Sequence, residues 1–440
     1  MRDILITAVV FGALLMIFKH PHYGIYLWSW LGYMNPHRQA WGFAYDMPFA
    51  MLAAIVTMVA YFLSKEPKRI AWTPEVIVLV IFNIWMFVTT IFSFYPDLAW
   101  MQWDKVWKIQ LMTLVTLMLI TNRQRVNGLI WVIVISLGYY GVKGGVFTIA
   151  TGGDFRVWGP AGTFIAGNNE LALALIMTVP LIRYLHLQAK GKLERYGLAA
   201  AMLLMSVAAI GSQSRGALLA IVAMGVFLWM KSRKKLVTGM YVLVSVAILA
   251  AVMPQSWYDR MHTIKTYEED GSALGRINAW HTAFNVAKDR ITGGGFEMFG
   301  PSTFRTYAPE PFRVHDAHSV YFEILGEHGF IGLALWLLVA LLAWRRASRI
   351  IRVCKNKPSQ QWAADLAAMV QVSMVGYLTG GAFLGLAYFD FYYHLVVILL
   401  VITKYAESEE SEPLDEVEPA RQAPAHPASR WEQRSVWQRK

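Results

Sequence analysis

Residues 318–344, HSVYFEILGEHGFIGLALWLLVALLAW, begin like an active site and end like a membrane helix. The second half is uniformly apolar, and the whole stretch exceeds the roughly 20 residues that a helix needs to cross a bilayer. The first half carries His318, Glu323 and Glu327. Because a charge inside a bilayer costs about 2.5–3.5 kcal/mol on insertion scales, these first turns indicate a functional site at the end of a transmembrane helix.

The composition of the whole chain also indicates a membrane protein. Of its 440 residues, 56% are hydrophobic and 16% are charged, whereas soluble domains carry roughly 25% charged residues. Eighteen Trp and twenty Tyr residues suit aromatic belts at the two membrane interfaces. We attribute the net charge of +11 to positive cytoplasmic loops, so we expect membrane lipids and no nucleic acid among the partners.

Apolar runs recur from end to end and predict an all-α polytopic integral membrane protein with about twelve transmembrane helices. The runs lie near residues 49–64, 75–95, 106–120, 127–150, 170–187, 197–211, 216–231, 237–253, 319–344, 364–385 and 387–404. Residues 4–35 add one long interrupted crossing or two short ones. They lack a small-residue cleavage site, so we expect a retained span and not a signal peptide.

Clusters of Lys and Arg fall on alternate loops and predict the orientation. They are Lys65, Lys68 and Arg69; Arg123 and Arg125; Lys190, Lys192 and Arg195; Lys231, Arg233, Lys234 and Lys235; and Arg345, Arg346, Arg349, Arg352, Lys355 and Lys357. The positive-inside rule makes this side cytoplasmic. If residues 4–35 cross once, both termini lie in the cytoplasm; if they cross twice, thirteen spans place the N-terminus outside.

The opposite side receives one long segment, residues 254–318, which we expect to be functional because long loops rarely serve as mere connectors. Its SALGRINAWHTAFNVAKD stretch has helical spacing of apolar residues, with Ser272 as the expected N-cap, and a glycine-rich TGGGFEMFGPSTF loop follows. We therefore expect a transmembrane catalytic domain over 1–404 that includes this outer loop. The acidic, then Pro/Ala-rich residues 405–440 predict a disordered cytoplasmic tail.

Four arginines on the predicted outer side oppose the positive-inside bias: Arg156, Arg215, Arg276 and Arg313. Each one alone can anchor a helix end or bind a lipid headgroup. Arg215 fits that role worst, because it lies between two apolar runs in GSQSRGALLA and would face the protein interior or a cavity. Several guanidinium groups together are typical of a phosphate or pyrophosphate site, since the planar fork bonds two oxygens at once.

The polar first turns of the opening stretch allow two interpretations. A histidine such as His318 at a helix N-terminus can be a structural hydrogen bonder, but its helical face continues to Gly329 and Gly332 and is expected to pack against neighbouring helices. Glu323 and Glu327 lie one turn apart, and we expect them to orient the outer arginines. In the alternative interpretation they face water in an outer vestibule.

Several kinds of site are missing from the sequence. The outer loops contain no Asp-x-Asp pair, no Cys/His cluster has zinc spacing, and no phosphate-binding Gly-x-x-x-x-Gly-Lys-Ser/Thr loop occurs. We therefore expect no metal site, no cofactor and no ATPase activity. The single cysteine, Cys354, falls in a predicted Lys/Arg-rich loop and excludes an intrachain disulfide.

Taken together, these motifs resemble the O-antigen ligase and polymerase superfamily. HSVYFEILGEHGFIG resembles its signature of a His, a Ser or Asn, a hydrophobic helix and Glu-x-Gly-x-x-Gly. SQSRGALLA resembles its Ser-Arg-Gly segment, and GSALGRINAWHTA its Gly-Arg…Trp helix. GGDFRVWGPAGTFIAGNNELALAL is most similar to the branch often labelled O-glycosylation ligases. The similarity covers most of residues 70–405.

The resemblance implies a glycosyltransferase in the bacterial inner membrane with its active site facing the periplasm. The donor would be a glycan on undecaprenyl pyrophosphate and the acceptor a hydroxyl of the lipid A–core oligosaccharide. Carried over by motif, Arg215 and Arg276 would hold the pyrophosphate and His318 would be the general base. Arg156 matches less specifically and is expected to be a second pyrophosphate or lipid contact, with Arg313 as a further substrate-binding candidate.

Other activities share much of this pattern. An O-antigen polymerase or a protein O-oligosaccharyltransferase would use the same donor and differ only in the acceptor, which no motif identifies. A transporter of lipid-linked sugars would use the arginines as a substrate path. Such transporters often have two related halves, and the sequence has no internal repeat.

Overall fold

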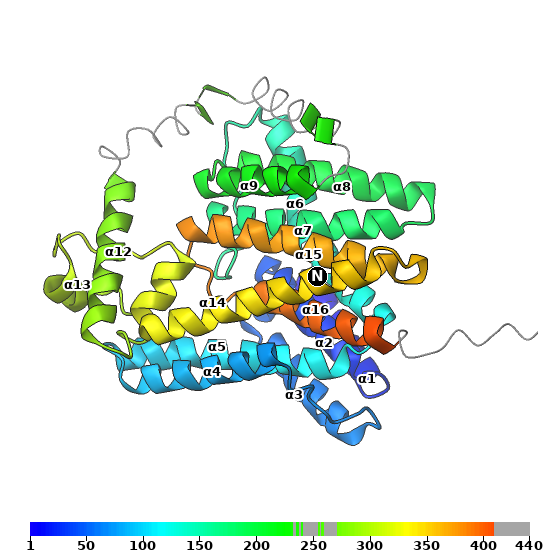
Figure 1. Ribbon diagram of the computed structural model, residues 1–440, viewed down its shortest axis with the longest axis horizontal. Coiled ribbons are helices and arrows are strands. Elements are labelled where there is room, and N and C mark those ends of the chain that lie inside the picture. The colour runs from blue at the N-terminus through cyan, green and yellow to red at the C-terminus, as the bar shows by residue number, and fades with distance from the viewer. Residues whose placement is uncertain (232–234, 237–238, 241–253, 256, 259–270, 409–440) are drawn as a thin grey trace, which may run out of the picture.

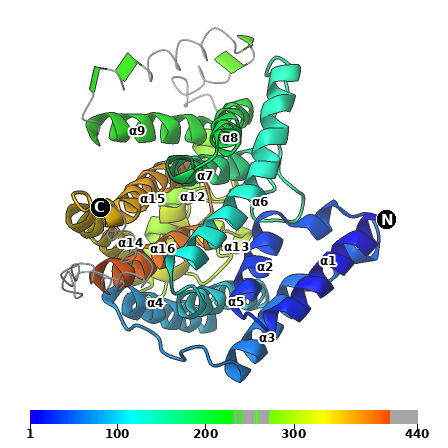
Figure 2. The ribbon, with the colours of Figure 1, turned by 90° about the vertical axis from the view of Figure 1, so that its right-hand side faces the viewer.

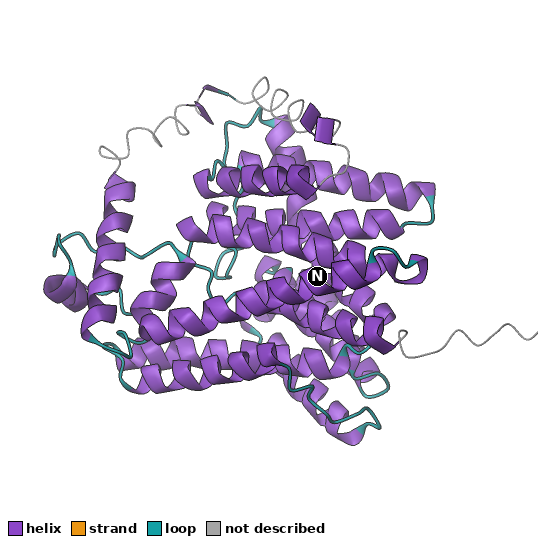
Figure 3. Cartoon of the chain, in the orientation of Figure 1, coloured by secondary structure: helices purple, strands orange, loops and turns teal. Residues whose placement is uncertain are grey.

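The computed structural model describes residues 1–231, 235–236, 239–240, 254–255, 257–258 and 271–408, and the regular elements within these ranges are helices (Figures 1 and 3). The α-helices are α1 (Arg2–Ile17), α2 (His22–Tyr33), α3 (Phe49–Leu63), α4 (Pro74–Ile91), α5 (Pro96–Leu119), α6 (Arg123–Ala150), α7 (Asn168–Gln188), α8 (Lys192–Gly211), α9 (Arg215–Lys231), α12 (Gly271–Asp289), α13 (Pro301–Tyr307), α14 (Val320–Cys354), α15 (Gln361–Gly380) and α16 (Asp390–Ser408). Short 3-10 helices are η1 (Pro36–Gln39), η2 (Phe43–Asp46), η3 (Pro358–Gln360) and η4 (Gly381–Phe383). The predicted span 237–253 and the tail from residue 409 lie outside the described residues.

The long helices form a bundle in which α4, α14, α15, α7 and α8 each pack on the next (Figure 1). Six described helical segments, those around α4, α6, α7, α8, α14 and α15, are long and apolar enough to cross a bilayer, and α3 and the start of α16 are shorter apolar helices. This agrees with a polytopic all-α protein. The expected count of about twelve spans is not confirmed.

Several buried hydroxyls of the apolar helices are satisfied within their own helix. The hydroxyls of several buried threonines donate to the carbonyl four residues earlier, namely those of Thr57, Thr90, Thr113, Thr116, Thr148, Thr178 and Thr403. An unsatisfied hydroxyl would be costly in an apolar environment, and this local bond removes that cost without a partner from another helix.

Small residues allow the closest helix contact, which joins α6 to α8. A Cβ atom on Gly145 would lie 2.2 Å from the Leu204 carbonyl oxygen, and one on Gly144 would lie 3.2 Å from the Ala208 Cβ. Only glycine permits this approach of two backbones, which is a common way to pack helices in membranes.

The cationic clusters gather at one end of the bundle, which we call the inner end; the opposite end is the outer end. At the inner end, Arg125 donates to both carboxylate oxygens of Glu66, at 2.6 and 3.2 Å. Arg346 on α14 donates in the same way to Glu75 on α4, at 2.7 and 2.9 Å. Each carboxylate is thus matched by a guanidinium that bonds both of its oxygens.

Residues 4–35 form two helices and not one crossing. Tyr26 on α2 donates to the Arg125 carbonyl at the inner end (2.9 Å), whereas the Asp3 carboxylate accepts bonds from Gly42 N and Ala44 N in the α2–α3 connection (both 3.1 Å). The chain therefore begins at the outer end, on the flank where α1, α2 and α3 lie together (Figure 2). Two helices fit the alternative with two short crossings, and the side of the membrane on which the N-terminus lies stays a prediction.

Two further boundaries differ from the sequence-based expectation. Helix α14 continues ten residues beyond the predicted 319–344, so Cys354 is buried at its end and does not lie in a loop. Helix α5 begins at Pro96, so the predicted outer loop at 96–105 is helical. In both cases charged residues were taken as the end of a helix, although they lie on helical turns that continue past the apolar run.

Candidate functional site

His318 lies directly before α14 in a left-handed backbone conformation, with φ of 42°. Ser319 is the N-cap and Val320 the first helical residue, so the expectation that the helix and its packing face begin at His318 is wrong. A positive φ is uncommon outside glycine, and such conformations cluster at functional sites where the surrounding structure enforces them. The His318 side chain is half-buried.

Helix α12 holds the segment that carries His318. The Trp280 indole nitrogen donates to the Ala317 carbonyl at 2.8 Å. The same ring stacks on Phe322 of α14, with centroids 4.9 Å apart and planes at 8°. The residues before and after His318 are thus both fixed to one tryptophan. The predicted helix from residue 272 is confirmed by α12, which is described from Gly271, whereas the N-cap role of Ser272 stays a prediction.

Burial and three neighbouring titratable groups determine the protonation of His318. Burial lowers the pKa of His318, Asp316 raises it, and Arg276 and His315 lower it further. The net shift is downward, so the imidazole is neutral at pH 7. The His315 and His318 ring centroids are 5.2 Å apart. A neutral imidazole close to a guanidinium can accept a proton, which an imidazolium cannot.

Arg276 connects His318 to the first turn of α7. Its guanidinium interacts electrostatically with Glu170 as well as with His318. Two residues before Glu170, the Asn168 side chain donates to the Ser212 carbonyl at 2.8 Å. The start of α7 therefore links the outer-loop helix α12 to the junction between α8 and α9.

That junction places Arg156 and Arg215 close together. Gln213 has a left-handed backbone (φ 56°), and its side-chain oxygen accepts a bond from Arg156 Nε at 3.4 Å. Arg215 follows two residues later as the first residue of α9, whose first turn is capped by the Ser214 hydroxyl bonded to Ala217 N (3.2 Å). The sequence expectation of a cation at a helix junction is met in this geometry.

The 3-10 helix η4 adjoins Gly216, the residue after Arg215, and Val320, two residues after His318. A Cβ atom on Gly216 would lie 3.3 Å from the Phe383 Cβ, and one on Gly381 would lie 3.1 Å from the Val320 side chain. These contacts join the starts of α9 and α14 through one short helix. The structure thus brings Arg156, Arg215, Arg276 and His318 to one region of the outer end.

No described contact brings Arg313 into this group. Its guanidinium pairs with Glu310 at 3.2 Å; the Arg313 side chain is 40% exposed, and its Nη1 atom is buried. Asn278 on α12 fixes the local chain by donating to the carbonyls of Glu310 and Arg313, at 2.9 and 3.0 Å. Arg313 lies on the outer surface of the loop in this arrangement.

Glu327 is buried and Glu323 is partly buried, and their hydrogen bonds do not involve arginine. Glu323 accepts from Ala387 N at 3.3 Å. Glu327 accepts from Glu297 N at 2.9 Å and from the Tyr388 hydroxyl. The expected arginine partners are therefore replaced by backbone and phenol donors. The burial of Glu327 does not fit the alternative of a water-facing pair, whereas Glu323 is partly exposed.

The backbone of α14 departs from helical geometry at Gly329 (φ 66°). The glycine-rich loop donates hydrogen bonds to carbonyls that the helix leaves unpaired there. The carbonyls freed there accept bonds from outside the helix: Gly326 from Gly294 N (2.8 Å) and Glu327 from Gly295 N (2.9 Å). The His328 carbonyl accepts from the Trp85 indole (2.8 Å). A Cβ atom on Gly329 would lie 2.4 Å from the Ile291 carbonyl oxygen, so the loop can approach only a glycine here.

A chain of buried hydrogen bonds runs through His328. Its Nδ1 pairs with the Thr89 hydroxyl at 2.7 Å and its Nε2 with the Tyr388 hydroxyl at 2.8 Å, and Tyr388 continues to Glu327. The sequence analysis missed His328 and Tyr388 as members of this site. The Glu-His-Gly of the opening stretch contained the signal for the histidine, but nothing local indicated the tyrosine 60 residues away.

Other acidic groups near the site were also missed. Asp316 and Glu297 flank the arrangement, and burial and Asp316 raise the pKa of Glu297 while Lys105 opposes them. The only sequence signal was their position in the outer loop. In the described part of the chain, no three His, Cys, Asp or Glu side chains are placed to hold a metal ion.

Comparison with known families divides the chain into two regions. Residues 200–337 match the model of the O-antigen ligase family, and residues 1–190 match a family of unknown function (DUF5935). No curated protein matches the chain. The first match contains Arg215, Arg276 and His318, and it confirms the resemblance to the O-antigen ligase and polymerase superfamily. The family implies a glycosyltransferase-like ligase or polymerase of O-antigen biosynthesis.

Proposed function

We propose, on the premise of this superfamily match, that the protein moves O-antigen glycan from undecaprenyl pyrophosphate onto the lipid A–core oligosaccharide. It does so in the bacterial inner membrane, with its site at the periplasmic face. The acceptor hydroxyl oxygen forms a bond to the anomeric carbon, and the bond from that carbon to the pyrophosphate oxygen breaks. The hydroxyl proton moves to His318, and undecaprenyl pyrophosphate leaves with the electron pair. A single displacement inverts the anomeric centre.

The observation that carries this proposal is the position of His318 at the outer end, where Trp280 holds the residue before it and Arg276 acts on it electrostatically. Arg276 is close enough to lower the pKa of His318. A proton acceptor and a cation for the leaving group therefore lie within one electrostatic environment. The left-handed backbone conformation of His318 and the stacking of Trp280 on Phe322 favour a preorganised site.

The arginines supply the charge that a departing pyrophosphate requires. Arg215 and Arg276 would bind its oxygens, and Arg156, beside Gln213, would add a further contact at the same junction. Guanidinium groups can take the place of a divalent cation here because they deliver positive charge together with directed hydrogen bonds. Arg313 would meet the substrate at the outer surface.

The buried carboxylates position this machinery and do not bind metal in the proposal. Glu327 holds the glycine-rich loop through Glu297 N and reaches His328 through Tyr388. Glu323 holds the segment after η4 through Ala387 N. The two glutamates thus fix the walls on either side of the start of α14, where substrate would enter.

The decisive experiment is a gel of lipopolysaccharide from a ligase-deficient host that makes a suitable donor and core. The host expresses the wild type, His318→Ala or Arg215→Ala at matched membrane levels. Exposed residues provide matched controls: His281→Ala on α12 and Arg195→Ala at the inner end. We expect a glycan ladder on lipid A–core with the wild type and both controls, and none with the two site variants.

The same host distinguishes the alternatives. A wild-type strain without a ladder, but with longer lipid-linked glycan, would assign a polymerase. A glycosylated protein in place of the ladder would assign a protein O-oligosaccharyltransferase. If His318→Ala only halved the ladder, a general base would be excluded.

A further inference from the structure

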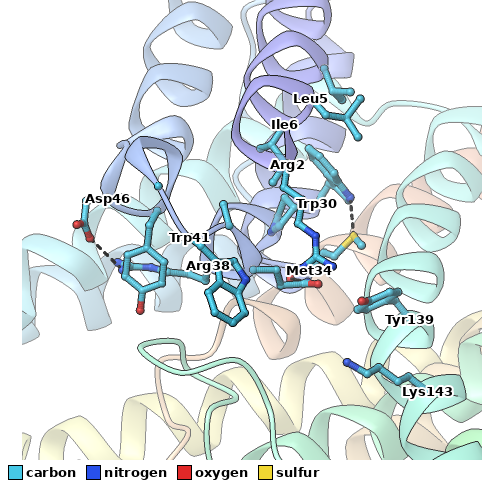
Figure 4. Close-up of a pocket in the computed structure, with 16 residues that line it drawn as sticks. Arg2, Leu5, Ile6, Trp30, Met34, Arg38, Trp41, Asp46, Tyr139 and Lys143 are labelled. Carbon is cyan, nitrogen blue, oxygen red and sulfur yellow. Dashed lines mark hydrogen bonds and ion pairs between the residues drawn. The ribbon is translucent and has the colours of Figure 1, made fainter.

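A hollow lies at the outer end, away from His318, between α1, α2, α6 and the η1–η2 connection (Figure 4). Its volume is about 1020 Å³. Every residue that borders it belongs to the region matched by the family of unknown function, residues 1–190. None of the candidate catalytic or substrate-binding residues borders it, so the superfamily match does not account for it.

Three cations from three elements border this hollow: Arg2 of α1, Arg38 of η1 and Lys143 of α6 (Figure 4). The carboxylate of Asp46 also borders it and pairs with Arg38 at 3.3 Å. Three cations less one carboxylate leave two positive charges. Outer-end cations oppose the positive-inside bias, so their concentration in one hollow calls for an anionic ligand.

Lys143 is the least expected of the three cations. It lies within α6, which is apolar enough to span a bilayer, and its exposed neighbours along that face include Tyr139 and Phe147. In the described part of the chain no ion pair or hydrogen bond involves its ammonium group. A charge inside a transmembrane helix is costly and generally marks a functional contact.

Aromatic and apolar side chains complete an amphipathic lining. Trp41 is 91% exposed beside the hollow, and Tyr45 lies under the Arg38 guanidinium, 4.6 Å from ring centroid to Cζ. Leu5 and Val9, both exposed, extend the lining along α1 into the apolar part of that helix. Polar groups at the outer rim thus continue into an apolar wall, which matches a molecule with an anionic head and a hydrocarbon tail.

We propose that this hollow binds the phosphate-bearing headgroup of a membrane lipid, with the phosphate between Arg2, Arg38 and Lys143 and an acyl chain along Leu5 and Val9. The two surplus positive charges match a phosphate monoester, which carries about −1.5 to −2 at pH 7. A phosphodiester carries one negative charge and binds less tightly. This site is separate from the proposed transfer site and does not depend on that function.

Native mass spectrometry of the full-length protein in detergent tests the proposal. Phosphatidic acid, phosphatidylglycerol and phosphatidylcholine are titrated separately onto the wild type, Lys143→Gln, Arg2→Gln and the control Lys192→Gln, an exposed lysine at the inner end. We expect the wild type to prefer phosphatidic acid over phosphatidylglycerol and phosphatidylglycerol over phosphatidylcholine. Each cation removed from the hollow should weaken phosphatidic acid binding about 5-fold, while the control changes nothing.

Three results would overturn the proposal. An equal loss in Lys192→Gln, or no loss in Lys143→Gln with an unchanged melting temperature, would show general attraction of anionic lipid to a basic protein. A competition arm adds glycerol 3-phosphate, which has the same phosphate monoester but no acyl chain. We expect it to displace phosphatidic acid only at a large excess; displacement at equal concentration would assign the hollow to a soluble phosphate.

Discussion

The two ends of the bundle treat buried carboxylates in opposite ways. At the inner end, hydrogen bonds from Arg125 lower the pKa of Glu66, and Arg346 matches Glu75. At the outer end, burial and Asp316 raise the pKa of Glu297, and Glu327 is held by a phenol and a backbone N–H. The inner-end carboxylates are held by ion pairs with arginine, whereas Glu327 at the outer end is held by neutral donors. The difference separates structural charge from functional charge.

The largest effect should come from the outer end. His318→Ala removes a general base, so we expect transfer to fall about 100- to 10,000-fold. Donor binding and melting temperature should remain near wild type, because His318 precedes α14 and is only half-buried. The measurement is transfer by purified protein with lipid-linked donor and lipid A–core, beside His281→Ala. An equal loss of transfer in both variants would mean that His318 has no specific role in the reaction.

At the inner end the expected effect is on stability alone. Arg346→Ala leaves Glu75 buried without its guanidinium, and breaking such a pair costs about 3–5 kcal/mol. Thermal unfolding in detergent should show a lower midpoint, whereas transfer per folded molecule should be unchanged. The double variant Arg346→Met with Glu75→Leu should recover most of the lost stability. A variant that folds normally but is inactive would contradict the division of roles between the ends.

A substitution at the break in α14 should lower both transfer activity and stability by an intermediate amount. Gly329→Ala adds a Cβ atom at a positive φ and 2.4 Å from the Ile291 carbonyl oxygen, and backbone strain of this kind costs about 1–3 kcal/mol. The glycine-rich loop would then separate from α14 and disturb Glu327. Gly138→Ala, on α6 with open space around it, is the matched control. Equal melting temperatures for the two variants would show that the glycine-rich loop can shift to accommodate the added Cβ atom.

The pH dependence should distinguish His318 from an ordinary histidine. Burial lowers the pKa of His318 below its usual value of 6.5, and a general base works only while neutral. Transfer should therefore persist below pH 6.5 and decline as pH falls through the lowered pKa. A rate profile from pH 4.5 to 8 checks this, and an acid limb centred above 6.5 would mean that a different group accepts the proton.

The last prediction concerns removal of metal ions, for which we expect no effect on transfer. Because the arginines supply the positive charge in the proposed reaction, chelation by EDTA should leave transfer unchanged. Activity that falls with EDTA and returns with Mg²⁺ or Mn²⁺ would mean that the outer carboxylates bind metal and would place them in the reaction.

The sequence was sufficient for properties that depend on local pattern. Apolar length predicted the helical membrane class. The orientation indicated by the charge clusters and the roles of Arg215 and Arg276 stay predictions. The partners of Glu327 could not be predicted, because Glu297 and Tyr388 lie in separate segments that meet only in the folded chain. The break at Gly329 was missed for a related reason: glycine is tolerated in a helix, and only the arriving loop makes its positive φ necessary.

The break in α14 also bears on the order of assembly during synthesis. Its free carbonyls are bound by Trp85 of α4 and by Gly294 and Gly295 of the outer loop. All three donors precede α14 in the chain, so a ribosome has already delivered them when Gly329 emerges. Helix α14 can therefore insert into the bilayer next to these donors, and its unpaired carbonyls need not be exposed to lipid.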